Sequence, residues 1–161
     1  MSTSILRHAS RHKLRCEGLI LTDNTMKDST ISMDGKHCFV CGPDNPQGLQ
    51  VKFRLEGDVC RAEFTPAAEH CGYSGVTHGG ILFSLLDDVM ANWLYLQGER
   101  AYTARCELRF REPAPTGEKL LFEGQLVKRK GRTAIMQGCA SLAENGTVVA
   151  EATATFMVAT E

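Results

Sequence analysis

Residues 80–97 are the only long helical candidate in this chain of 161 residues. Apolar side chains surround most of the circumference of the helix that these residues would form, which is typical of a helix enclosed by other structure. Gly98 follows at the position where helices commonly end. The remaining elements must cover this helix, and that requirement constrains the fold more than any other feature of the sequence.

The segments on both sides of the helix alternate apolar and polar residues, as half-buried strands do. Before the helix, residues 49–55 and 60–64 flank a Gly57-Asp58 turn and predict a hairpin. After the helix, four strand candidates are separated by turn signals, and they cover residues 104–111, 119–128, 132–143 and 147–158. We interpret these four as an antiparallel meander. The fold class is therefore α+β, an antiparallel sheet wrapped around one long central helix.

The first strand after the helix has the clearest alternation of the four. Ala104, Cys106, Leu108 and Phe110 would share one side of it, and the charged residues between them would share the other. We expect the first side to be buried and the second to face water.

The length and the apolar content of 43% suit one domain, which we assign to residues 36–161. Residues 1–35 show neither hydrophobic period, and they are predicted to be a poorly ordered tail. The tail is basic before its first acid at Glu17. An organelle presequence and a start codon placed too early, with Met26 or Met33 as the true start, are two alternatives that its composition leaves open.

The net charge of -1 offers no global field that would attract nucleic acid or an anionic membrane, so we expect neither partner. No apolar run approaches the length of a membrane span. The seven cysteines are odd in number, and several lie in apolar segments, among them Cys60, Cys106 and Cys139. This pattern predicts reduced thiols and a cytoplasmic location.

The turn His78-Gly79-Gly80 leads directly into the helix. The first amides of a helix have no partner within it, and they carry the positive end of its dipole. Because two glycines also let a ligand approach the backbone closely, a carbonyl could accept hydrogen bonds here as it becomes an oxyanion. The alternative is a tight loop in which the glycines serve backbone geometry alone.

Asp87 lies seven residues beyond Gly80, which returns it to nearly the same helix face roughly 10 Å further along. One carbonyl cannot touch both places, because a catalytic base must lie within about 3 Å of its target or one water away. We therefore expect a homodimer whose helices run antiparallel across a two-fold axis. The glycine turn of one subunit would then face Asp87 of the other, which makes two equivalent sites.

The polar residues around Asp87 allow a simpler interpretation. Their spacing matches the wet stripe of an amphipathic helix, and the stripe comprises Ser84, Asp87, Asp88, Ala91 and Asn92. Against this, adjacent carboxylates in so apolar a segment are costly to bury unless they are paired or used in chemistry, and burial raises the pKa of a carboxyl group toward that of a useful base. Asp88 is expected to reach solvent or a neighbouring arginine.

His78-Gly79-Gly80 with Asp87 nine residues after the histidine resembles the motif of the hotdog-fold thioesterases, in particular the phenylacetate-pathway type called PaaI. The resemblance covers roughly residues 37–158. It includes further short matches, which are Cys38-Phe39-Val40-Cys41-Gly42, Asn45-Pro46-Gln47-Gly48-Leu49, Gly131-Arg132 and Ala150-Glu151-Ala152.

This resemblance implies an enzyme that hydrolyses acyl-coenzyme A, with coenzyme A as part of the substrate and no separate cofactor. Asp87 would act as general base or nucleophile, and the Gly79 amide would polarise the carbonyl. Gly80 would belong to the same binding turn, and His78 would help to shape the pocket. Thr103 occupies the place of a hydroxyl residue that often positions water, although it is equally an ordinary strand threonine. The assembly would be a homodimer or a homotetramer.

The sequence departs from some relatives at Gly72, where they carry an asparagine six residues before the histidine. His70 or Asn45 could substitute for it, although each is more often a loop residue satisfied by backbone. A basic cluster at a predicted hairpin suits the phosphates of coenzyme A, and a solvated turn would look the same. Its members are Lys128, Arg129, Lys130 and Arg132.

Two other functions are compatible with the sequence. The first is a hotdog protein that binds acyl-coenzyme A without hydrolysing it, or one of the enoyl-hydratase type, because fold alone does not decide chemistry. The second is a zinc-stabilised interaction module built on His37, Cys38 and Cys41. A matching second pair of cysteines is missing, so no metal site is expected. The sequence does not identify the acyl group.

Overall fold

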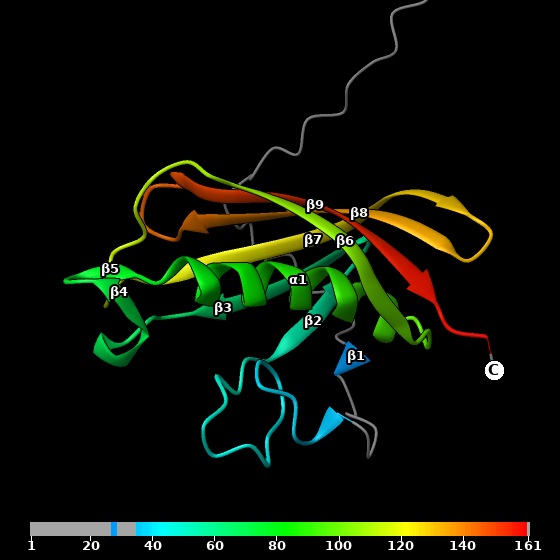
Figure 1. Cartoon of the computed structure of the whole chain (residues 1–161), viewed down its shortest axis with the longest axis horizontal. Coiled ribbons are helices and arrows are strands. Elements are labelled where there is room, and N and C mark those ends of the chain that lie inside the picture. The colour runs from blue at the N-terminus through cyan, green and yellow to red at the C-terminus, as the bar shows by residue number, and fades with distance from the viewer. Residues whose placement is uncertain (1–26, 29–34, 161) are drawn as a thin grey trace, which may run out of the picture.

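The computed structural model describes residues 27–28 and 35–160. Its centre is one long helix, α1 (Gly79–Tyr95), under a curved antiparallel sheet (Figure 1). The seven strands lie in the order β1-β2-β3-β7-β8-β9-β6. This arrangement confirms the predicted fold class. Of the tail predicted over residues 1–35, all but residues 27, 28 and 35 lie outside the described residues, so that prediction stays a prediction.

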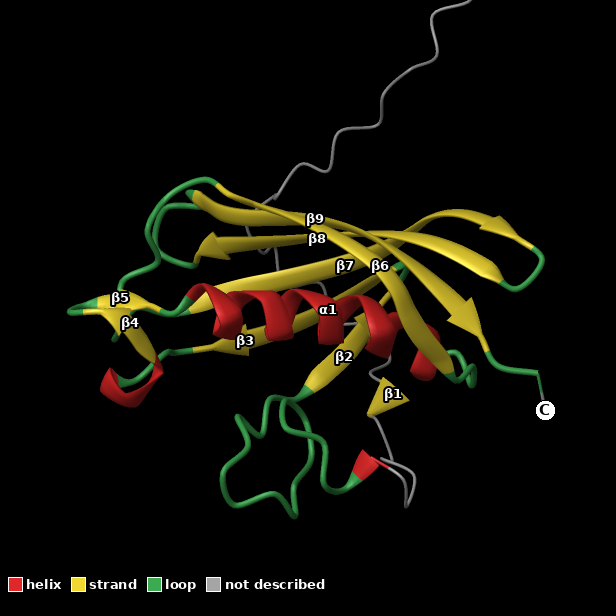
Figure 2. Ribbon diagram, viewed as in Figure 1, coloured by secondary structure: helices red, strands yellow, loops and turns green. Residues whose placement is uncertain are grey.

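The strands of the main sheet are β1 (Lys27–Asp28), β2 (Phe53–Glu56), β3 (Val59–Phe64), β6 (Ala101–Phe110), β7 (Leu120–Lys130), β8 (Thr133–Leu142) and β9 (Val148–Val158). A short 3-10 helix, η2 (Ala68–His70), and a separate two-stranded ribbon of β4 (Cys71–Tyr73) and β5 (Val76–Thr77) precede α1 (Figure 2).

The hairpin turns lie where the sequence predicts them. Gly57, Gly131 and Gly146 have φ values of 59°, 55° and 73°, which are left-handed conformations that favour glycine. In the last of these turns, the side chain of Asn145 accepts a hydrogen bond of 2.9 Å from the backbone amide of Thr147. These turns explain why β2–β3, β7–β8 and β8–β9 pair as neighbours.

The predicted four-stranded meander is wrong for its first strand. β7, β8 and β9 follow one another across the sheet, but β6 pairs with β9 rather than with β7. The edge of β7 is occupied by β3, which pairs with it from Cys60 to Phe64. The connection after β6, which contains Pro113 and Pro115, therefore crosses the sheet and leaves β6 at its free edge.

The expected burial of one side of β6 is only partly correct. Cys106 and Leu108 are half-buried, whereas Ala104 is exposed and Phe110 is 57% exposed. Two causes combine. β6 is an edge strand, and its register with β9 shifts between Thr103 and Arg105. This β-bulge interrupts the alternation, so Thr103 rather than Ala104 faces the helix.

The core lies between the sheet and one side of α1. The fully buried helix residues are Leu85, Leu86, Val89, Met90 and Leu94. The sheet approaches α1 closely at Gly124 of β7, where a Cβ atom would lie 2.9 Å from the carbonyl oxygen of Val89. At the far end of α1, Gly98 has a φ of 86°, and its amide donates to the Tyr95 carbonyl at 2.9 Å, which confirms the predicted helix end.

Within the described residues, no helix has the length and apolar character needed to cross a membrane. Cys38, Cys41, Cys60, Cys71 and Cys106 are free thiols. Cys139 is disulfide-bonded, so the expectation of a reduced thiol is wrong at that position.

Candidate active site

His78 organises the start of α1. It is the N-cap residue, and its Nδ1 accepts a hydrogen bond of 2.8 Å from the backbone amide of Gly80. Its carbonyl oxygen accepts from the amides of Ile81 at 3.0 Å and Leu82 at 3.3 Å. A neutral imidazole that accepts at Nδ1 carries its proton on Nε2. The exposed ring of His78 therefore keeps one N–H donor available at the helix N-terminus.

The two glycines after His78 are in different situations. The Gly80 amide is engaged by His78, and a Cβ at Gly80 would lie 2.9 Å from the Nδ1 atom of that ring. Among the described residues, the Gly79 amide donates to no other group. A Cβ at Gly79 would lie 2.9 Å from the Phe110 ring, so glycine is needed for close packing as well. Gly79 therefore supplies the free backbone donor of this turn.

Asp87 lies in the middle of α1 and is tied to β6. Its Oδ1 accepts a hydrogen bond of 2.8 Å from the hydroxyl of Thr103. Burial raises the pKa of the half-buried Asp87 carboxyl group above its ordinary value, while the bond from Thr103 acts in the opposite direction. Within the described part of the chain, the second carboxylate oxygen accepts no hydrogen bond. The site thus holds an oriented carboxylate with one oxygen available.

The turn and Asp87 are separated along the helix. Asp87 lies eight positions beyond Gly79, which corresponds to roughly 12 Å of helix. A carbonyl held at the turn is therefore out of reach of Asp87 in the same chain. The structure brings Thr103 to Asp87 and keeps His78 with Gly79, but it leaves these two pairs apart.

Asp88 faces a different environment from that of its neighbour. The side-chain amide of Asn92 donates to its Oδ2 at 3.1 Å, and the thiol of Cys41 lies beside it. Burial, with a further contribution from the charge of Asp87, raises the pKa of Asp88 to about 6. In the described structure no arginine pairs with Asp88, so that one of the two expected environments is wrong. The residue is only partly buried, so the expected contact with solvent is not contradicted. Sequence patterns did not predict the contact with Cys41, because the two residues lie 47 positions apart in the chain.

Gly72 replaces the asparagine that some relatives carry, and His70 and Asn45 are the two residues that could substitute for it. All three have partners within the fold. The space beside Gly72 is filled by His78, whose Cδ2 would lie 3.1 Å from a Cβ there. His70 accepts a hydrogen bond from the Ala67 amide at 2.9 Å. The side chain of Asn45 donates to the His37 carbonyl at 3.2 Å and accepts from the Gln47 amide at 3.0 Å. The suggested role of Asn45 in substrate binding stays a prediction.

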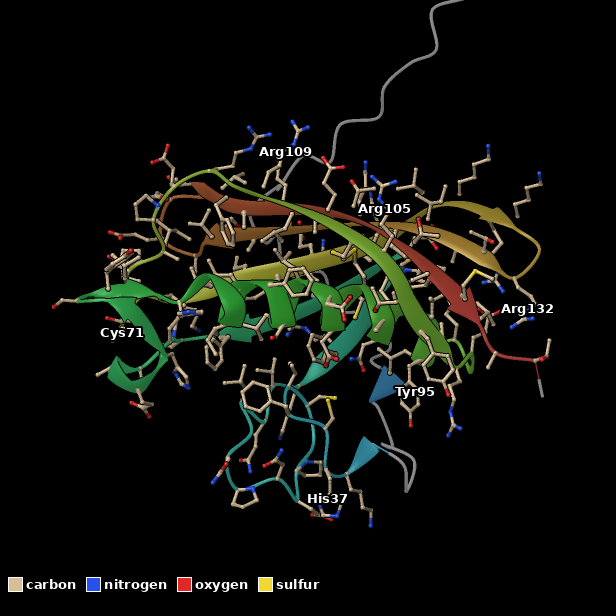
Figure 3. The ribbon with its side chains drawn as sticks, viewed as in Figure 1. His37, Cys71, Tyr95, Arg105, Arg109 and Arg132 are labelled. Carbon is tan, nitrogen blue, oxygen red and sulfur yellow. The ribbon has the colours of Figure 1, made fainter. Side chains whose placement is uncertain are left out.

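The basic cluster lies at the β7–β8 hairpin. Arg129 forms two hydrogen bonds with Glu99, of 2.6 and 3.0 Å, and Arg132 donates to the Val158 carbonyl at 2.9 Å. Lys130 is exposed and has no partner among the described residues. Figure 3 shows Arg132 at the opposite end of the molecule from Cys71, which precedes the His78 turn. Within one chain, this hairpin is remote from the glycine turn.

Comparison with known sequences points to one family. Residues 74–149 match the model described as "Thioesterase superfamily". The acyl-coenzyme A thioesterase THEM5 of Mus musculus is 28% identical over 99 residues, which cover 62% of this chain and 39% of THEM5. The chain therefore spans about two fifths of the length of that relative. These matches confirm the resemblance that the His78–Asp87 motif indicated.

Solved structures show the same fold. The PaaI protein of E. coli, from the phenylacetic acid degradation operon, has a TM-score of 0.65 at 21% identity, with 70% of this chain and 81% of PaaI covered. A Streptococcus mutans UA159 protein solved with acetyl-CoA has a TM-score of 0.64 at 21% identity, with 69% of this chain and 90% of that protein covered. Both likenesses confirm the hotdog fold.

Proposed function

Because residues 74–149 match the thioesterase superfamily model, we propose that this protein hydrolyses an acyl-coenzyme A thioester to a free acid and coenzyme A. The name of THEM5 and the acetyl-CoA bound to the S. mutans protein support this class of substrate. Coenzyme A is then part of the substrate, and the reaction needs no further cofactor.

The observation that carries the proposal is the setting of Asp87. Its carboxylate is half-buried, oriented by Thr103 and shifted in pKa toward that of an effective base. Asp87 would take a proton from a water molecule as the water oxygen attacks the thioester carbonyl carbon. The carbon–sulfur bond then breaks, and the departing thiolate takes up the proton from Asp87, which gives coenzyme A and restores the carboxylate.

The start of α1 would stabilise the charge on the carbonyl oxygen. The free Gly79 amide and the Nε2–H of His78 are two donors at the positive end of the helix dipole. The oxyanion forms only during attack, so these donors would act more strongly on the transition state than on the substrate. The start of α1 would therefore stabilise the oxyanion, and Asp87 in the middle of α1 would act as the base.

A homodimer would unite the two parts. We propose that Asp87 of one subunit faces the glycine turn of the other, with the helices antiparallel. The free edge of β6 and the exposed apolar side chains beside it, Phe83 at 40% and Phe110 at 57%, support an interface on this side of the molecule. Size-exclusion chromatography with light scattering should report a dimer or a tetramer, and a monomer would contradict the shared site.

The same antiparallel pairing would bring the β7–β8 hairpin of one subunit toward the glycine turn of the other. Lys130 and Arg132, with Arg129 once it is released from Glu99, would then be placed to bind the phosphates of coenzyme A. Their contribution would be to the affinity for substrate rather than to bond breaking.

The decisive experiment is a thiol-release assay over a panel of aromatic and medium-chain acyl-coenzyme A esters. Asp87→Ala and Asp87→Asn should each lower kcat by on the order of 10² to 10⁴, the range typical of a lost general base. Glu118→Gln removes an exposed carboxylate to which the proposal gives no role, and it should leave kcat unchanged. If wild-type protein binds the esters without releasing thiol, or hydrates enoyl esters in the same panel, the hydrolytic assignment is wrong.

We also propose a cytoplasmic location, which the five free thiols support. Fractionation of cells that express the full chain would test this proposal. Enrichment in an organelle would contradict it and would direct attention to residues 1–35.

A further inference from the structure

A second cluster of reactive groups lies on the other side of α1 from Thr103. The loop of residues 35–52, hereafter the cysteine loop, lies below β2 in Figure 1, and its Val40 and Val51 belong to the buried core that includes α1. It places the thiols of Cys38 and Cys41 beside the carboxylate of Asp88, with all three ligand atoms within 4.8 Å of one another. Nothing in the proposed hydrolysis uses this cluster.

The three groups form a donor set that suits zinc. Thiolate sulfur and carboxylate oxygen bind Zn²⁺ at about 2.3 and 2.0–2.2 Å, which places two ligands of a tetrahedral ion roughly 3.5–3.8 Å apart. The three ligand atoms lie within 4.8 Å of one another, so they must move closer together to reach that spacing when an ion binds. Two cysteines separated by two residues are a common half of a structural zinc site.

The backbone of the cysteine loop is shaped around these sulfurs. The Val40 amide donates to Cys38 Sγ at 3.4 Å, and hydrogen bonds of this kind orient the ligands of a metal site. Gly42 turns the chain back so tightly that a Cβ there would overlap the Cys38 nitrogen and lie 2.6 Å from the Lys36 oxygen. The Gly42 amide closes this turn with a bond of 3.0 Å to the Cys38 carbonyl.

Among the described residues, the carboxylate of Asp88 has no positively charged group beside it to balance its charge. Within the described structure, no lysine or arginine pairs with it, and Asn92 supplies only a neutral amide. Burial raises the pKa values of both Asp88 and Cys41. Buried carboxylates are usually paired or bind metal ions. A dication between these groups would offset the cost of burying both.

From this convergence of ligands, we infer that Cys38, Cys41 and Asp88 bind a zinc ion that ties the cysteine loop to the middle of α1. Water would complete the coordination. His37 takes no part, because its exposed side chain lies at the outer side of the loop, away from the helix (Figure 3). The site differs from the module considered from sequence, in which His37 was a ligand and Asp88 was absent.

The inferred ion has a structural role and does not depend on the proposed hydrolysis. Asp87 bonds to Thr103 on β6, whereas Asp88 faces the cysteine loop, so the two carboxylates serve different sides of the helix. Metal content, metal spectra and thermal stability therefore test the inference without any measurement of turnover.

The experiment uses full-length protein purified under reducing conditions without chelators. We expect about one zinc ion per chain by elemental analysis, and a thiolate-to-cobalt absorption band in the near ultraviolet after exchange with Co²⁺. Cys38→Ser/Cys41→Ser should lose both signals, and Asp88→Asn should weaken zinc binding on the order of tenfold or more in competition with a chelator. Cys71→Ser, an exposed free thiol outside the cluster, should keep both.

Circular dichroism of each variant establishes that it is folded. A chelator should lower the melting temperature of wild-type protein but not that of the double variant. The inference is overturned if reduced wild-type protein reconstituted with Zn²⁺ binds far less than one ion per chain, if the cobalt band is absent, or if the folded double variant retains its zinc. In the first two cases, the thiols are hydrogen-bond partners of Asp88 only.

Discussion

The two halves of the candidate active site lie on one helix but are built in different ways. The glycine turn is local, because His78 caps the helix through an amide only two residues away. Asp87 is oriented by Thr103, sixteen residues further along the chain, across a β-bulge in an edge strand. The turn can therefore form wherever the helix begins, whereas the carboxylate depends on the packing of β6 against α1.

The largest expected effect comes from mixing two inactive proteins. Asp87→Asn and Gly79→Ala should each be nearly inactive alone. In a homodimer of either variant, every site would lack either the carboxylate of Asp87 or an intact glycine turn. After partial unfolding and refolding together, half of the dimers should be mixed, each with one intact site. About a quarter of wild-type activity should return. No recovery, with mixed dimers shown by mass spectrometry, would mean that each site lies within one chain.

Gly79→Ala alone should lower kcat on the order of 10². The added Cβ would lie 2.9 Å from the Phe110 ring, so the turn or the ring must move, at a cost of about 1–3 kcal/mol in the free energy of unfolding. Gly79→Ala with Phe110→Ala relieves that contact. If this pair restores stability but not kcat, as measured by urea unfolding and thiol release, the amide position matters for catalysis. Full restoration of kcat would reduce Gly79 to a packing role.

Thr103→Val should lower kcat roughly tenfold by releasing the carboxylate from its orientation. The Thr103 bond lowers the pKa of Asp87, so its loss should raise that pKa further. Because the base acts in its ionised form, the acid limb of the pH profile of kcat should move to higher pH. Thr153→Val, at an exposed position of β9, is the matched control. An acid limb that stays in place would argue that Asp87 is not the titrating group.

The smallest effect on stability and turnover should come from substitution of His78, the N-cap residue of α1. His78→Ala should lower the free energy of unfolding by about 1 kcal/mol, whereas His78→Asn keeps an N-cap acceptor and should be nearly neutral. Both variants lose the Nε2–H donor, so both should lower kcat by a similar factor. Thermal melts and thiol release would separate the two roles. Normal turnover of His78→Asn would leave Gly79 as the donor of the turn.

Most of the fold follows from patterns that are short in sequence. The helix, the left-handed glycine that follows it at Gly98, and the hairpin turns at Gly57, Gly131 and Gly146 are where the sequence predicts them. The sequence did not predict where β6 lies in the sheet, because alternation within a strand carries no information about which neighbour the strand pairs with. The same applies to the bulge that turns Thr103 toward the helix.

The candidate residues divide in the same way. The glycine turn and Asp87 follow from their positions along one helix, and that spacing alone separates the turn from the acid. The role of His78 rests on the resemblance. Thr103 was named from resemblance, and its contact with Asp87 came from the structure. The meeting of Cys38 and Cys41 with Asp88 was not predicted, because ligands from a loop and a helix share no sequence period.

The amino-acid sequence by itself determined one enclosed helix, its glycine-rich start, the acid in its middle and the strands that cover it. These features depend on hydrogen bonds and periodicities that extend over a few residues. Only the tertiary structure decided that Asp87 faces the hydroxyl of β6 while Asp88 faces two thiols. Adjacent helix residues point about 100° apart, so different packing partners give the two carboxylates different surroundings.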